Sequence, residues 1–158
     1  MWGVDIYQRF DFFKPRQKAL ARYATEAEAI QDKVLRRLVE KAKATEWGRE
    51  HDYRSIKGYQ DFVQRVPVQT YEEIKGYVDR MRHGEKDILW PGEVVWYAKS
   101  SGTTNDKSKF IPVSKEGLQN VHYAGGRDAV ALYLQQNPNS RIFSGRTLIL
   151  GGSHAPNY

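Results

Sequence analysis

The spacing of apolar residues predicts that the first half of the chain is helical. Thr25 and Glu28 have the spacing of a capping box, which predicts that a helix begins at Thr25. Trp47-Gly48 marks its expected end. Between these points apolar residues recur every three or four positions, as in a helix with one buried stripe: Ala27, Ile30, Val34, Leu35, Leu38, Val39 and Ala42.

Two more helices are expected before residue 85, and both are interpreted as scaffold. Ser55 is the expected cap of a short helix that runs through Phe62. Thr70 and Glu73 form a second capping box, and Gly84 is a suitable end for the helix that follows. One side of that helix carries Ile74, Tyr77, Val78 and Met81.

After about residue 94 the pattern changes to short apolar runs. Residues 94–98 and 147–150 predict buried strands, and residues 110–113 predict a strand at a sheet edge because they include Pro112. Ser114 is the expected cap of a long helix that Asn137 stops. Its expected inward residues are Leu118, Val121, Ala129, Leu132 and Tyr133.

This order of elements predicts an α/β fold. Strands that are apolar on both sides belong in a sheet covered on both faces, and two or three of them do not make such a sheet alone. We therefore expect residues 1–158 to form a partial N-terminal domain, mainly helical over 1–85 and strand–loop–strand–helix–strand over 94–158. The remainder of the large domain is then absent.

Composition and charge narrow the function classes. The 158 residues are 40% hydrophobic and 13% aromatic, which excludes an intrinsically disordered chain. The absence of cysteine excludes disulfides and thiolate sites. No apolar run is long enough for a membrane span, and Asp5, Arg9 and Asp11 interrupt any signal-like segment, so we expect a cytoplasmic protein without a membrane partner. The net charge of +6 is spread along the chain, and no nucleic-acid partner is expected.

One polar segment carries chemistry. Ser100, Ser101, Gly102, Thr103 and Thr104 are consecutive, and Lys109 follows five positions later. Hydroxyls and free backbone amides donate hydrogen bonds to phosphate oxygens, and an ammonium group offsets phosphate charge. From the residues alone, a polar turn capped by its own hydroxyls is an equally good interpretation.

In context, this segment resembles the phosphate loop of the adenylate-forming, firefly-luciferase-like superfamily. The positions of Lys109 and Pro112 are similar, more narrowly, to the auxin-responsive Gretchen Hagen family of acyl-acid amido synthetases, and to its bacterial branch. Asn105 and Asp106 stand where family loops often have glycine. Motifs in the same order support the resemblance: Thr45-Glu46-Trp47-Gly48, Tyr71-Glu72-Glu73-Ile74, Arg80 with Gly84-Glu85, and Leu89-Trp90-Pro91-Gly92.

The resemblance implies the front portion of an ATP-dependent ligase, with ATP and Mg²⁺ as cofactors. Such an enzyme adenylates a carboxylic acid and transfers the acyl group to an amine or amino acid. Lys109 is the implied catalytic cation, and no residue is assigned as a metal ligand. The implied ATP-binding residues are Ser100, Ser101, Gly102, Thr103 and Thr104. We expect residues 1–158 to be inactive alone, because the family's later motifs and its C-terminal domain are absent from them.

The resemblance also implies that the acyl acid lies along the helix after the loop. Gly126 and His122 are four residues apart and share a helix face, so they are substrate-binding candidates together with Tyr123 and Arg127. Close helix packing or a kink are alternative reasons for Gly125-Gly126. Two other function classes stay open: a non-catalytic nucleotide-binding or interaction module, and a serine-dependent acyl transferase that uses the same loop.

Overall fold

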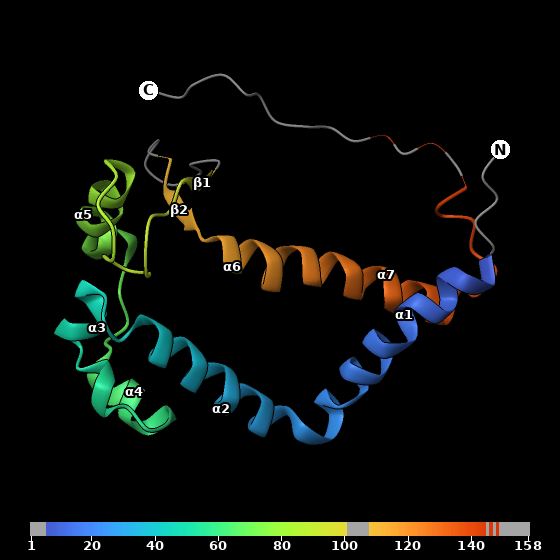
Figure 1. Cartoon of the computed structure of the whole chain (residues 1–158), viewed down its shortest axis with the longest axis horizontal. Coiled ribbons are helices and arrows are strands. Elements are labelled where there is room, and N and C mark those ends of the chain that lie inside the picture. Colours follow the sequence, from blue (N-terminus) through green and yellow to red (C-terminus); the bar gives the residue numbers. More distant parts are fainter. Residues whose placement is uncertain (1–5, 101–107, 145, 147, 149–158) are drawn as a thin grey trace.

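Three long helical segments form an open frame in the computed structural model, which describes residues 6–100, 108–144, 146 and 148. Helices α1 (Ile6–Ala21) and α2 (Tyr23–Ala42) meet at a corner (Figure 1). The third segment consists of α6 (Lys115–Gly117), the π-helix η2 (Leu118–Tyr123) and α7 (Ala124–Gln136). It runs from a small sheet back to α1, and α1 packs against α7.

Helix α2 begins earlier than the capping box predicts. Thr25 lies inside the helix, and Glu26 has non-helical angles (φ −124°, ψ 17°) that mark a kink. The Glu26 carboxylate accepts two hydrogen bonds from Arg22, at 2.9 and 2.5 Å, so a charged pair spans the kink. The prediction that Thr25 is the N-cap is therefore wrong.

The helix ends at Ala42, and a buried threonine joins it to α3 (Glu46–Glu50). Thr45 Oγ1 donates to the Ala42 carbonyl at 2.7 Å and accepts from the Gly48 N–H at 3.0 Å. A Cβ on Gly48 would lie 2.2 Å from the Ala42 oxygen, so only glycine fits there. Trp47 and Gly48 thus belong to the next helix rather than to the end of α2.

The two following helices test the predicted caps. Helix α4 (Tyr59–Arg65) exists, but Gly58 stands at its N-cap. Ser55 instead lies in the 3₁₀-helix η1 (Tyr53–Ser55), where its hydroxyl bonds Asp52. The capping box of α5 (Tyr71–Arg82) is confirmed, since the Thr70 N–H donates to Glu73 Oε2 at 2.6 Å. Gly84 follows with φ of +90°, as its predicted role requires.

Strands β1 (Trp96–Lys99) and β2 (Phe110–Val113) form an antiparallel pair, with Lys99 opposite Phe110. The strand predicted over 94–98 is present, but it begins at Trp96, and the prediction that it is buried is wrong because Trp96 is 50% exposed. Val94 is buried just before the strand, in a cluster with Met81 and Ile88. The described part is therefore mostly helical with a two-stranded sheet, which supports the α/β expectation only in part.

The long helix after β2 begins and ends where the sequence predicts. Ser114 Oγ accepts from the Gly117 N–H at 3.0 Å, and Asn137 is the C-cap. The predicted buried face is wrong. Ala131 and Leu134 contact Phe13 of α1, whereas four of the five expected inward residues, all but the half-buried Leu118, are exposed: Val121, Ala129, Leu132 and Tyr133.

The reason is the position of α1. It covers the other side of α7, and the described residues place no second layer over the predicted stripe. The predicted strand at 147–150 lies outside the described residues, apart from Leu148, which is exposed and not in a strand.

Candidate functional site

The two ends of the polar loop lie at the end of the β1–β2 hairpin where the loop joins the two strands. The Ser100 N–H donates to the Lys109 carbonyl at 2.9 Å, and the Lys109 N–H donates to Ser100 Oγ at 3.0 Å. The Ser100 hydroxyl therefore serves as an acceptor, and it donates to none of the described residues. Ser101, Gly102, Thr103 and Thr104 lie outside the described residues.

The Lys109 ammonium lies beside an aromatic ring. Its nitrogen is 5.6 Å from the centroid of the Tyr71 ring, and the side chain is exposed. None of the described carboxylates forms an ion pair with it. The positive charge at the end of the loop is thus not cancelled by a described neighbour.

The expected acid-site residues lie together on the following helix. The rings of His122 and Tyr123 are 5.5 Å apart, and both residues belong to the π-helix η2. A π-helical turn is uncommon and occurs frequently at functional sites, but the spacing of apolar residues does not reveal it. Gly126 and Arg127 follow on exposed positions of α7.

The two helix glycines face open space. A Cβ built on Gly125 or Gly126 has no described heavy atom within 4 Å. Close packing between described elements therefore does not explain them. The irregularity of the helix, the π-helix η2, lies before Gly125 rather than at it.

The structure brings the candidate residues together as two separate groups. Ser100 and Lys109 meet at the hairpin, and His122 meets Tyr123 on the helix, with β2 and α6 between the groups. Tyr71 also belongs to the first group, although its sequence motif predicts only a helix start. Its hydroxyl accepts from the Phe110 N–H at 3.0 Å, across 39 residues of sequence.

Several motifs of the resemblance form a structural joint rather than a site. Arg80 donates to both oxygens of Glu46, at 2.6 and 2.7 Å, and also bonds Glu85 at 2.8 Å. The hydrogen bond from Arg80 is the main cause that lowers the pKa of Glu46. With Thr45 and Gly48, these residues fix α3 against α5 below the hairpin.

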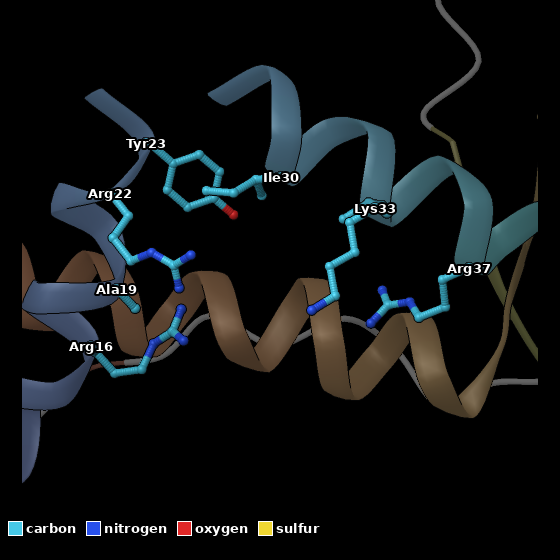
Figure 2. Close-up of a pocket in the computed structure, with 8 residues that line it drawn as sticks. Arg16, Ala19, Arg22, Tyr23, Ile30, Lys33 and Arg37 are labelled. Carbon is cyan, nitrogen blue, oxygen red and sulfur yellow. The ribbon is translucent and has the colours of Figure 1, made fainter. Parts of the chain in front are cut away.

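A cavity of about 420 Å³ lies at the α1–α2 corner, away from the β1–β2 hairpin (Figure 1). Figure 2 shows the guanidinium groups of Arg16 and Arg22 at one end and the charged ends of Lys33 and Arg37 at the other. Arg16 and Arg22 are already paired, with Asp128 and Glu26. The described lining offers positive charge but no carboxylate and no histidine.

Two further observations concern the described ranges only. No three histidine or acidic side chains there gather as a metal site. No helix there is long and apolar enough to cross a membrane.

Comparison with known proteins identifies relatives of the chain. Residues 16–155 match the model described as "GH3 family N-terminal domain". An indole-3-acetic acid-amido synthetase of Arabidopsis thaliana, GH3.17, is 34% identical over 104 residues, which are 65% of this chain and 17% of that protein. The 4-substituted benzoates-glutamate ligase GH3.12 of the same plant is 28% identical over 118 residues, 72% of this chain and 20% of its own length.

A solved structure agrees with these matches. The AtGH3.15 acyl acid amido synthetase in complex with 2,4-DB superposes with a TM-score of 0.69 at 28% identity, over 85% of this chain and 23% of that one. The chain thus spans about a fifth of the length of the relatives named here. These are plant enzymes and give no support to the expected likeness to the bacterial branch. The chain belongs to the GH3 family of acyl acid amido synthetases, and its matched residues correspond to that family's N-terminal domain.

Proposed function

We propose that residues 1–158 form a partial N-terminal domain of an ATP-dependent ligase that joins a carboxylic acid to an amine or amino acid. The names of the relatives support this proposal, since they join indole-3-acetic acid or benzoates to amino acids. The observation that carries it is the pair of hydrogen bonds that joins Ser100 to Lys109 at the ends of the loop, with no described carboxylate paired to the Lys109 ammonium.

The proposed reaction has two steps. A carboxylate oxygen of the acid attacks the α-phosphorus of ATP, and the bond from that phosphorus to the bridging oxygen breaks, which releases pyrophosphate. The amine nitrogen then attacks the acyl carbon, AMP leaves with the bonding electrons, and the nitrogen loses a proton to solvent. Negative charge builds on the departing pyrophosphate in the first step, so donors at that position accelerate it.

The loop residues have the chemistry for this task. Ser100, Ser101, Thr103 and Thr104 are the proposed donors to the phosphates. Gly102 allows the backbone to approach closely. Lys109 is the proposed cation, and its ammonium is exposed and free of any described carboxylate.

Mg²⁺ is part of the proposal as a partner of ATP. It binds phosphate oxygens and water and needs only one or two protein carboxylates. Phosphate oxygens and water would therefore supply most of its ligands. When bound, the ion offsets phosphate charge, a load that it shares with Lys109.

We further propose that the acid lies along η2 and α7. The open space above Gly126 and the neighbouring rings of His122 and Tyr123 support this placement. Arg127 is exposed beside Gly126 and is the proposed partner of a carboxylate. Asp128 faces away toward α1, because Arg16 binds it.

Exchange of labelled pyrophosphate into ATP tests the proposal. Residues 1–158, fused to the rest of AtGH3.15 in place of its matching region, should catalyse exchange that depends on an added acid. Residues 1–158 alone should not. Robust exchange by the chain alone would contradict the proposal, as would a folded fusion without exchange. Covalent labelling of a loop serine by a fluorophosphonate would instead favour a serine-dependent acyl transferase.

A further inference from the structure

An aromatic residue of helix α5 contacts the lysine end of the loop. Tyr71 is the first residue of α5. Its hydroxyl bonds the Phe110 N–H, and its ring lies beside the Lys109 ammonium. We propose that Tyr71 is a positioning residue that fixes Lys109 for phosphate binding. This inference rests on the proposed function of the loop.

The hydroxyl fixes the backbone. Strand β2 has one described neighbour, β1, and the Phe110 N–H finds its acceptor in Tyr71 Oη at 3.0 Å instead of in a second strand. Phe110 follows Lys109 directly. The hydrogen bond therefore fixes the backbone position at which Lys109 joins strand β2.

The ring holds the ammonium without cancelling its charge. Lys109 Nζ lies 5.6 Å from the Tyr71 ring centroid, within the range of a cation–π contact. A carboxylate in the same place would form an ion pair and compete with phosphate for the lysine. An aromatic face orients the side chain and leaves its charge available.

The helix itself is held at both ends. The Thr70–Glu73 capping box fixes the first turn, where Tyr71 stands. In the last turn, the Arg82 guanidinium lies 3.7 Å from the Phe110 ring centroid. Helix α5 thus contacts both the backbone and the ring of Phe110, through Tyr71 and Arg82 respectively. This gives the motif Tyr71-Glu72-Glu73-Ile74 a role in placing the loop.

Binding of inorganic tripolyphosphate to the 158-residue chain tests the inference by isothermal titration calorimetry. Tyr71→Leu removes the hydroxyl and the ring, and should weaken binding roughly tenfold. Tyr71→Phe keeps the ring and should weaken it about threefold, which is a partial rescue. Lys109→Ala should weaken binding at least as much as Tyr71→Leu. Tyr77→Phe is the matched control, because Tyr77 lies on the same helix and bonds Glu50 instead of the loop.

A merely structural role has a different signature. It would lower the urea midpoint of Tyr71→Leu and leave the affinity of the folded protein unchanged. Affinity of Tyr71→Leu within twofold of the parent would overturn the inference, and so would parent binding that does not depend on Lys109. Tripolyphosphate binding that depends on both residues, in a protein whose fusion shows no pyrophosphate exchange, would support the inference and refute the ligase proposal.

Discussion

Arg16 and Asp128 form a two-pronged ion pair across 112 residues of sequence. The guanidinium of α1 donates two hydrogen bonds of 2.7 Å to the carboxylate of α7, beside the cluster of Phe13, Ala131 and Leu134. Hydrogen bonding to Asp128 is the main cause that raises the pKa of Arg16. The pair fastens the two ends of the open frame.

We expect this pair to couple energetically. In a double-mutant cycle of Arg16→Gln and Asp128→Asn, urea unfolding should give a coupling energy of about 1 kcal/mol. This is less than the coupling energy of a buried pair, because both side chains are partly exposed to solvent. The exposed i,i+4 pair Arg22–Glu26 is the control and should give a smaller coupling energy, because solvent screens it more strongly. Equal coupling energies in the two cycles would show that the Arg16–Asp128 pair stabilises the protein no more than an exposed pair within one helix does.

Gly48 should tolerate no side chain. Gly48→Ala places a methyl group 2.2 Å from the Ala42 carbonyl oxygen, and should lower the free energy of unfolding by about 1–3 kcal/mol. Gly76→Ala is the matched control inside α5, where a Cβ meets no described atom. It should raise stability by about 0.5–1 kcal/mol. A neutral Gly48→Ala in urea unfolding would refute the close contact.

The Glu46–Arg80 pair predicts a loss of stability in acid. Since Arg80 lowers the pKa of Glu46, the pair contributes fully above the ordinary glutamate value of about 4.3 and is lost as the pH falls through the lowered value. The urea midpoint of the parent should therefore fall more steeply below that pH than the midpoint of Glu46→Gln. Glu72→Gln, which removes an exposed carboxylate on α5, should keep the parent's profile. Parallel profiles for the parent and Glu46→Gln would contradict the assignment.

The open space at Gly126 predicts a specific kinetic effect in the fused enzyme. Gly126→Leu should raise the KM for the acid well above any change in the KM for ATP, because the added side chain fills the proposed acid site. Gly125→Leu is the control, since its Cβ is equally free but points about 100° around the helix. An unchanged KM for the acid, with a lower melting temperature, would favour packing as the role of Gly126.

Local signals predicted the fold where the contacts are local. Thr70 and Glu73 lie three residues apart, and their capping box is present as predicted. The prediction that Thr25 is the N-cap is wrong because Arg22 binds Glu26 and the helix continues through a kink. The prediction of the buried face of α7 is wrong because that face packs against Phe13 of α1, more than 100 residues away. The spacing of apolar residues within one helix does not reveal such a distant contact.

The site shows the same division. Composition singles out the segment from Ser100 to Lys109, the resemblance implies its phosphate-binding role, and the structure brings its two end residues together. Tyr71 is not predicted as a site residue because its contact with Phe110 spans 39 residues of sequence. Its motif is already explained as the start of a helix. The π-helix that carries His122 and Tyr123 has no signal in the apolar spacing.

Pyrophosphate exchange in loop variants of the fused enzyme tests the central claim most directly. Thr103→Val removes a donor at nearly constant volume, and Lys109→Ala removes the cation. Each should lower acid-dependent exchange about 10²–10³-fold, the usual cost of one transition-state donor. Lys115→Ala, which removes an exposed lysine of α6, should leave exchange near the parent rate. Exchange within a few-fold of the parent in both loop variants would contradict the account.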